Sequence, residues 1–280
     1  MRCRRRDRQE DCHGHHRWGS AGDNAEVLIM NNPFAVGYVD PSTSDNEPVH
    51  ISTRNSIRIH DKLIQGSDEW LAARCGLLTA SEMKHIITPT LKVADNDKTR
   101  AHLWELLFQR LTRFVEPQYV SDAMLRGQED EIYARAAYSE HYAPALEAGF
   151  ITNDQWGFTI GYSPDGLVGD DGLIECKSRA GKFQVQTIAE NEVPAEYMIQ
   201  LQTGLLVSGR KWIDFISYSG GLPMFVKRVE PDAQIQDAIL TAAQSFELKL
   251  AEKEREYRAS LAAMAKLIPT ERRTDMEIIL

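Results

Sequence analysis

Three side chains that could carry out chemistry lie close together in the sequence: Asp165, Glu175 and Lys177. Side chains of an extended strand alternate between its two faces, so Glu175 and Lys177 would share one face while Cys176 points to the other, into the core. The segment 170–172 (Asp-Asp-Gly) has the composition of a tight turn, which would fold the next strand back beside the preceding one. Asp165 would then lie near Glu175, and two carboxylates and an ammonium would share one small site.

Such a site suits the hydrolysis of phosphodiesters with a divalent metal ion. Carboxylate oxygens are hard ligands that hold Mg²⁺ and leave coordination positions for water and phosphate. The metal would lower the pKa of bound water, and a lysine beside that water could orient or deprotonate it. Each fragment alone is commonly structural, since Pro-Asp-Gly is an ordinary turn and Glu-Cys-Lys could be part of a solvated strand. The apolar residues around Glu175 disfavour an exposed strand, and a buried Glu–Lys pair needs a reason.

The elements that would position this site change in type along the chain. Helical spacing of apolar residues, with capping residues and prolines at the ends, predicts helices. Short runs punctuated by Gly, Asp and Pro predict strands. The predicted helices cover residues 68–75, 79–87, 100–111, 123–142, 193–207 and 232–267, and the predicted strands cover 158–162, 166–168, 173–176, 212–219 and 225–229. This order predicts a mixed α/β domain.

Composition excludes several classes of protein. With 280 residues, 42% hydrophobic and 26% charged, the chain is typical of a globular protein, and it lacks an apolar stretch of the roughly 18 residues that span a bilayer. The formal net charge of −9 excludes a protein that coats nucleic acid through overall positive charge, but not a nuclease with a basic groove. The four cysteines are widely spread, which favours a reducing cytoplasm over a disulfide framework.

The first 56 residues differ from the rest. Residues 1–18 are rich in Arg and His and lack the apolar core of a secretory signal, and residues 40–48 read as a polar linker. Cys3, Cys12 and the nearby histidines match no standard structural metal site.

The pair Pro164-Asp165, followed by Glu175, Cys176 and Lys177, resembles the active-site signature of the PD-(D/E)xK nucleases. Around it, the chain resembles the lambda exonuclease and YqaJ-type viral recombinase family, from about residue 66 to about residue 229, through four separated motifs in family order. The resemblance implies a restriction-endonuclease-like core, in which a central mixed β-sheet is flanked by helices. We expect residues 57–280 to form a single nuclease domain with a long C-terminal helix, and residues 1–56 to be a disordered or poorly conserved N-terminal extension.

The family's functional roles transfer to the positions that match its motifs. Arg74 and Ser81, in the first motif, would bind the terminal 5′-phosphate of the recessed strand, although they could also be a surface cation and a helix cap. Glu131, in the second motif, would be an acid on the side of the second metal. Its neighbours Glu129 and Asp130 are typical of a solvated helix face.

The third motif would supply most of the catalytic groups. Asp165 and Glu175, with the Cys176 carbonyl, would hold the principal metal, and Lys177 would activate the attacking water. In the fourth motif, Gln200 would support the lysine and a nearby phosphate.

Gln202, which lies in the same motif, is the weaker match. Beyond residue 229 the resemblance fades, so residues 232–280 receive no family role.

The function implied by the resemblance is a Mg²⁺-dependent 5′→3′ exonuclease acting on double-stranded DNA ends. It would release 5′-mononucleotides and leave 3′ overhangs for recombination by single-strand annealing. A two-metal site in which Mn²⁺ can replace Mg²⁺, a homotrimeric ring with a central DNA channel, and a single-strand annealing protein as partner are also implied. The protein would be encoded by a phage or prophage and work in the bacterial cytoplasm.

Two other functions remain alternatives. One is a different nuclease on the same core, such as an endonuclease; an iron–sulfur exonuclease would need clustered cysteines, which Cys3, Cys12, Cys75 and Cys176 do not provide. The other is a non-catalytic DNA-end-binding recombination scaffold, which a missing acid in the site would favour. No acid is missing.

Overall fold

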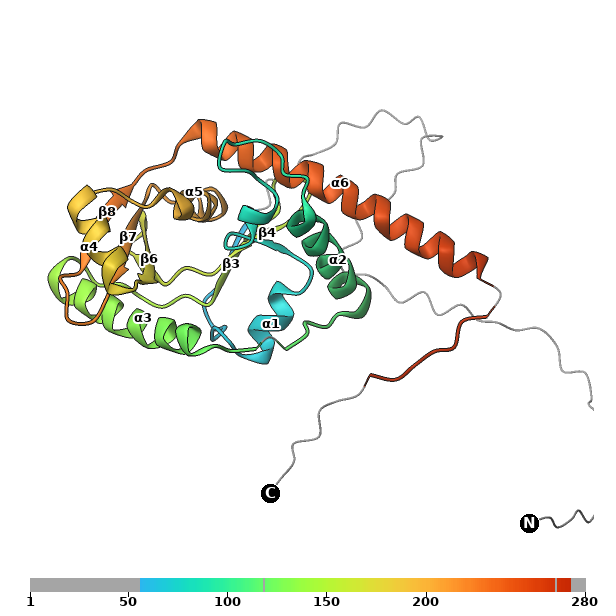
Figure 1. Ribbon diagram of the computed structural model, residues 1–280, viewed down its shortest axis with the longest axis horizontal. Coiled ribbons are helices and arrows are strands. Elements are labelled where there is room, and N and C mark those ends of the chain that lie inside the picture. Colours follow the sequence, from blue (N-terminus) through green and yellow to red (C-terminus); the bar gives the residue numbers. More distant parts are fainter. Residues whose placement is uncertain (1–55, 118, 265, 273–280) are drawn as a thin grey trace, which may run out of the picture. The chain divides into compact units, whose positions relative to one another are not determined.

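The computed structural model describes residues 56–117, 119–264 and 266–272, which contain both strands and helices (Figure 1). The strands are β1 (Ile57–His60), β2 (Leu78–Thr79), β3 (Phe150–Asn153), β4 (Ile160–Tyr162), β5 (Gly166–Val168), β6 (Gly172–Ser178), β7 (Trp212–Tyr218) and β8 (Phe225–Val229). The helices are α1 (Asp68–Arg74), α2 (Asp97–Thr112), α3 (Asp122–His141), α4 (Gly181–Glu190), α5 (Ala195–Ser208) and α6 (Ala233–Ala263), with a short 3₁₀ helix, η1 (Met83–His85). The predicted mixed α/β class is confirmed. The extension predicted for residues 1–56 lies, apart from residue 56, outside the described residues.

These strands form two four-stranded sheets. Sheet 1 contains β1, β3, β4 and β2 in that order, and sheet 2 contains β5, β6, β7 and β8. Both are mixed, since β2 runs parallel to β4 and β6 runs parallel to β7, while the other neighbours are antiparallel. The expected central sheet is therefore divided between β4 and β5. Pro164 lies in this link, and a proline has no N–H with which to continue a ladder of hydrogen bonds.

The strand that carries the predicted catalytic residues lies in the middle of a layered structure. Helix α3 packs against β6 and β7, and α5 packs against β7 from the other side (Figure 1). On the α3 face, Ile174, Cys176 and Ile216 cluster with Ala134 and Tyr138. The prediction that Cys176 points into the core is confirmed, and the alternation places Glu175 and Lys177 on the opposite face.

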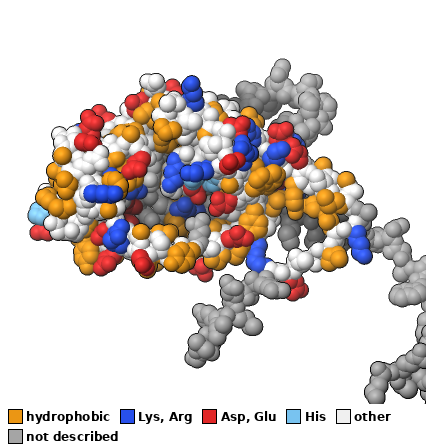
Figure 2. Space-filling view, viewed as in Figure 1, with side chains coloured by type: hydrophobic (Ala, Val, Ile, Leu, Met, Phe, Trp, Pro, Cys, Tyr) orange, Lys and Arg blue, Asp and Glu red, His pale blue; other side chains and the backbone are white. Residues whose placement is uncertain are grey.

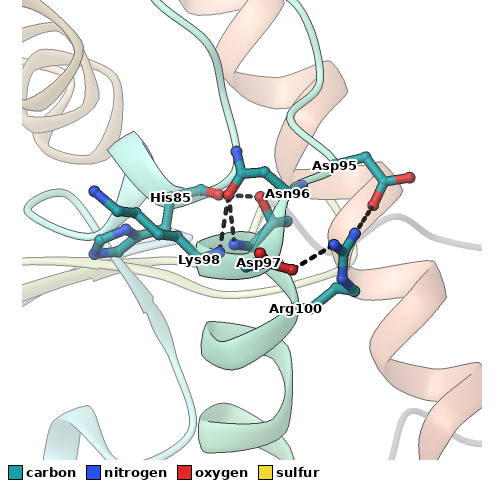
Figure 3. A network of polar contacts seen from close by, with 7 residues as sticks. His85, Asp95, Asn96, Asp97, Lys98 and Arg100 are labelled. Atoms are coloured by element: carbon teal, nitrogen blue, oxygen red, sulfur yellow. Dashed lines mark hydrogen bonds and ion pairs between the residues drawn. The ribbon is translucent and has the colours of Figure 1, made fainter.

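The start of α2 is fixed by a capping box that also holds η1 (Figure 3). The side-chain oxygen of Asn96 accepts the backbone N–H groups of Lys98 and Thr99, at 2.9 and 3.1 Å. The hydroxyl of Thr99 donates to the carbonyl of His85, at 2.7 Å. Because these bonds satisfy the free N–H groups of the first turn, α2 begins before the predicted residue 100 and is tied to the loop that follows β2.

The helix predicted for residues 79–87 is wrong. Leu78 and Thr79 form β2, which pairs in parallel with Ile160 and Gly161 of β4, and Ala80 N–H donates to the Gly161 carbonyl at 2.9 Å. Only the three residues of η1 are helical. The backbone of Thr79 is thus engaged in a sheet, so Ser81 does not begin an α-helix and has no helix N-terminus to offer an anion.

Helix α6 begins and ends close to its predicted bounds. Asp232 caps it by accepting the Ile235 N–H at 3.0 Å, and it ends at Ala263 rather than at residue 267. Apolar side chains at helical spacing along α6 are buried, with Ile239, Ala242, Phe246 and Leu250 in the main core cluster. None of the helices in the described ranges is long and apolar enough to cross a membrane.

An ion pair joins α6 to α2 and to the loop before β2. The guanidinium of Arg110 donates two hydrogen bonds to the carboxylate of Glu247, at 2.8 and 2.7 Å, and its Nε donates to the carbonyl of Gly76, at 2.8 Å. Both side chains are largely buried, 27% and 14% exposed. A bidentate pair with little access to water is worth more than an exposed one.

Replacing Arg110 with alanine should therefore destabilise the fold by about 1.5–3 kcal/mol, the range for hydrogen bonds to a charged group. The free energy of unfolding in urea measures this. Arg58→Ala is the matched control, because its pair with Asp154 is 60% and 42% exposed and should contribute at most about 1 kcal/mol. Equal losses in the two variants would contradict the assignment.

Candidate active site

Glu175 is the buried centre of the site. Its side chain is 3% exposed and accepts hydrogen bonds from three elements. The hydroxyl of Tyr162, at the end of β4, donates to Oε2 at 2.8 Å. Lys177 Nζ and Gln200 Nε2 both donate to Oε1, at 2.7 and 2.6 Å. Three donors, one of them cationic, replace the water that this carboxylate loses on burial.

Asp165 lies beside Glu175, as the predicted turn requires. Strands β5 and β6 pair antiparallel, with Gly166 opposite Ile174, and Asp165 Oδ2 accepts the backbone N–H of Cys176 at 2.6 Å. Burial raises the pKa of Asp165 well above its usual range, and the charges of Glu175 and Glu131 add to the rise. Three carboxylates therefore lie close enough to repel one another, and a cation would relieve that repulsion.

Glu131 reaches the site from α3. Its carboxylate accepts from Arg135, one turn along the same helix, at 2.9 Å, and Arg135 also donates to the carbonyl of Asp165, at 3.0 Å. Burial raises the pKa of Glu131, while Arg135 opposes the rise. Asp130 instead accepts from the hydroxyl of Ser178 at 2.5 Å, and Glu129 is exposed. Of the three neighbouring acids, it is Glu131 that faces Asp165 and Glu175.

Lys177 is held by its acidic neighbours. Burial by itself lowers the pKa of Lys177, but the charges of Glu175 and Asp165 outweigh burial and raise it above its usual value. Its Nζ also lies 5.6 Å from the centre of the Tyr197 ring. The side chain is thus a protonated, fixed donor, and it stays so for as long as the two carboxylates keep their full charge.

The donor set fits a hard divalent cation. Asp165, Glu175 and Glu131 supply oxygens in a place where their like charges are compensated only in part, by Lys177 and Arg135. In the described ranges no three His, Cys, Asp or Glu side chains form a group with metal-binding geometry. Cys176 N–H donates to Asp165, Lys177 to Glu175 and Arg135 to Glu131, so each of the three carboxylates has a donor in this structure.

A second polar group lies around Arg74, at the end of α1. The guanidinium stacks on the ring of Trp70, 4.2 Å from its centre, and its Nη2 donates to Thr79 Oγ1 at 3.4 Å. Thr79 Oγ1 is 3.4 Å from Ser81 Oγ and donates to the carboxylate of Glu82 at 2.6 Å. Burial lowers the pKa of Arg74, and Glu82 opposes this. Arg74 and Ser81 are therefore brought together, as predicted, while Thr79 and Glu82 were missed.

The two groups are joined through the link between the sheets. Trp70 Nε1 donates to Ser163 Oγ at 3.0 Å and to the carbonyl of Gly149 at 3.1 Å. Ser163 stands between Tyr162, which binds Glu175, and Pro164-Asp165. A hydroxyl directly before a Pro-Asp pair was the sequence signal that could have found it.

Comparison with protein families matches the YqaJ-like viral recombinase domain to residues 69–211, a range that contains every predicted site residue. The chain belongs to this family. No curated protein matches it in sequence. Among solved structures, an alkaline exonuclease (LHK-Exo) from Laribacter hongkongensis is 33% identical, with a TM-score of 0.63, and the match covers 70% of this chain and 98% of that one. A structure of LHK-Exo in complex with dAMP is 34% identical, with the same TM-score and coverage. The restriction-endonuclease-like fold is thereby confirmed, and the YqaJ-like family supports a phage-type exonuclease.

The crowded carboxylates predict a gain of stability when one of them is neutralised. Because the pKa of Asp165 is raised in the fold, its ionised form destabilises the fold above the folded pKa, and the penalty disappears as the pH falls below the unfolded value. Asp165→Asn keeps an acceptor for Cys176 N–H. In a chelator, it should unfold at a higher urea concentration than the wild type at pH 8.

This gain should shrink towards about pH 4, near the pKa of an unperturbed aspartate. Glu129→Gln, on the exposed face of α3, is the control and should change little at either pH. A loss of stability in Asp165→Asn, or a gain that does not depend on pH, would contradict the electrostatic reading.

Proposed function

We propose that this protein is a Mg²⁺-dependent 5′→3′ exonuclease acting on double-stranded DNA ends. It releases 5′-mononucleotides and leaves 3′ overhangs for phage-type recombination by single-strand annealing. The observation that carries the proposal is the buried group of Asp165, Glu175 and Lys177, with Glu131 facing it and Arg74 and Ser81 within reach of the same link. A non-catalytic scaffold would have no need of acids held against their mutual repulsion.

In this proposal Asp165, Glu175 and the carbonyl of Cys176 hold the principal metal, and Glu131 serves a second one. Mg²⁺, which Mn²⁺ can replace, makes bound water more acidic and offsets charge on the phosphate. Membership of a family of phage-type nucleases supports a divalent metal. The fold holds both carboxylates in place, because the Cys176 N–H donates to Asp165 and the Tyr162 hydroxyl donates to Glu175. Neither side chain therefore has to lose further conformational freedom when DNA binds.

Lys177 and Gln200 position the groups that react. Lys177 orients the attacking water or accepts its proton. The water oxygen forms a new bond to phosphorus as the bond to the 3′ oxygen breaks, and that oxygen leaves on the released nucleotide and takes up a proton from solvent. Lys177 can accept a proton only when the charges of Glu175 and Asp165 are offset, because those charges hold its pKa high. Gln200 keeps Glu175 in place from α5 during this change.

The 5′ direction rests on Arg74 and Ser81, which bind the terminal phosphate. A terminal phosphate carries close to two negative charges near neutral pH, more than an internal diester. A guanidinium fixed against the Trp70 ring can use that difference through charge-assisted hydrogen bonds. The complex of LHK-Exo with dAMP, a 5′-mononucleotide, is consistent with such a pocket.

The proposed assembly is a homotrimeric ring around DNA, working with a single-strand annealing protein. The net charge of −9 supports a ring that encloses the DNA, because a chain with this charge cannot retain DNA by overall electrostatic attraction. On the face shown in Figure 2, Lys and Arg side chains lie among Asp and Glu side chains. Enclosure by a ring would hold a polyanion without a continuous basic surface.

The direct test is to incubate linear duplexes labelled at one 5′ end or one 3′ end with protein and Mg²⁺. The 5′ label should appear early as a mononucleotide, while the 3′ label stays on a strand that shortens gradually. A chelator should stop both, and Asp165→Asn should lower kcat by about a hundredfold or more. Early release of internal fragments would favour an endonuclease. DNA binding without cleavage in Mg²⁺ or Mn²⁺ would favour a scaffold.

The polarity should depend on Arg74. Wild-type protein should degrade 5′-phosphorylated ends faster than 5′-hydroxyl ends. Arg74→Ala should slow the phosphorylated ends by about 1.5–3 kcal/mol of activation free energy, the range for a hydrogen bond to a charged group. Hydroxyl ends should change much less, and Arg58→Ala, which removes an exposed cation, should keep the preference. An unchanged preference in Arg74→Ala would show that Arg74 does not bind the terminal phosphate.

A further inference from the structure

An acidic side chain stands inside the group that is proposed to bind phosphate. The carboxylate of Glu82 accepts the hydroxyl proton of Thr79, with the two oxygens 2.6 Å apart. The same hydroxyl oxygen accepts from Arg74 and lies 3.4 Å from Ser81 Oγ. Glu82 is half-buried and its charge acts on Arg74. It therefore belongs to this group of side chains, the proposed phosphate pocket, and is not a solvated neighbour of it.

This arrangement is unexpected for a site that only has to hold an anion. Arg74 contributes one positive charge and Glu82 one negative charge, so the pocket itself is close to neutral. Placing a carboxylate next to a dianionic phosphate is unfavourable, and the penalty is greater for a phosphate monoester than for a neutral hydroxyl. If tight binding were all that the pocket had to provide, an uncharged residue at this position would serve better.

The proposed reaction supplies a reason for weakened binding. In each cycle the phosphate in this pocket belongs to the nucleotide that is removed, and it leaves with the mononucleotide. The next nucleotide, whose own 5′-phosphate has just been formed, must then enter the same pocket. A phosphate held too tightly would keep the product bound and slow every cycle.

We infer that Glu82 is a specificity and release residue, whose carboxylate competes with the 5′-phosphate for the Thr79 hydroxyl and for the charge of Arg74. The inference rests on the proposed function. When a terminal phosphate enters, it takes over Arg74, Ser81 and Thr79, and Glu82 gives up its hydrogen bond. When the mononucleotide leaves, Glu82 accepts from Thr79 again, which restores the state seen in the structure.

The test compares wild type with Glu82→Gln, which removes the charge but keeps an oxygen that can accept from Thr79. Binding of dAMP and of deoxyadenosine is measured by calorimetry. Glu82→Gln should bind dAMP about fivefold tighter or more, as expected when one unit charge about 4 Å away is removed in a water-like medium. Deoxyadenosine binding should not change. Steady-state degradation of a long 5′-phosphorylated duplex should become slower and more sensitive to inhibition by added dAMP.

Two further measurements separate this role from a structural one. The gain in dAMP affinity should fall as salt is raised, because ions screen the charge of a side chain that is still partly exposed, whereas a packing effect would persist. Glu69→Gln removes an exposed acid from α1, outside the pocket, and should leave dAMP affinity unchanged.

The possible failures are distinguishable. If wild type binds dAMP no better than deoxyadenosine, the pocket does not bind phosphate and the proposed 5′ function fails with it. If wild type prefers dAMP but Glu82→Gln binds it equally or more weakly, the function stands and the role of Glu82 is overturned.

Discussion

The burial of Glu175 is the constraint on which the site depends. A carboxylate cannot lose its water without other donors, and Glu175 takes its donors from three places: Tyr162 on β4, Lys177 on its own strand and Gln200 on α5. Sheet 1, sheet 2 and α5 must therefore all be packed before the charge is stabilised. Hydrogen-bond donors from several layers of the fold thus replace the water around the Glu175 carboxylate.

The site is also a place where the fold gives up stability. Asp165 and Glu131 repel Glu175, and Lys177 and Arg135 compensate for this repulsion in part. Unrelieved charge of this kind is common where function needs a reactive group, and other parts of the fold offset it. The core beneath β6 and the ion pair between α2 and α6 are regions that can do so.

The link between the sheets gives the molecule its functional geometry. Tyr162 donates to Glu175, Ser163 accepts from Trp70, and Asp165 accepts from the Cys176 N–H. The segment 162–165 therefore contacts both the group of carboxylates and the group around Arg74. The pairing of Thr79 with Gly161 sets β2 against the same segment. If a 5′-phosphate binds as proposed, a few residues of backbone fix its separation from the carboxylates. In the proposed function, that separation determines how many nucleotides are removed in each cycle.

Local spacing in the sequence was enough to place the main catalytic candidates. Period-two alternation set Glu175 and Lys177 on one face with Cys176 on the other, and the turn at residues 170–172 returned β6 to Asp165. Strands β5 and β8 were predicted at their observed bounds, and most long helices within a few residues. Strands β1 and β3 and helix α4 were missed, because their short or irregular apolar patterns do not stand out from loops. The catalytic and binding roles stay predictions for all of the site residues: Arg74, Ser81, Glu131, Asp165, Glu175, Cys176, Lys177 and Gln200.

What only the tertiary structure decided depends on partners distant in sequence. Thr79 forms a strand instead of a helix because its backbone pairs with Gly161, and the composition around Thr79 carries no trace of that pairing. Arg135 and Tyr162 became part of the site through bonds to Asp165 and Glu175. The sequence determined which residue types share a face of one element, since that follows from the period of a strand or helix. Which elements meet, and hence which charges must compensate one another, follows from packing between segments far apart in the chain.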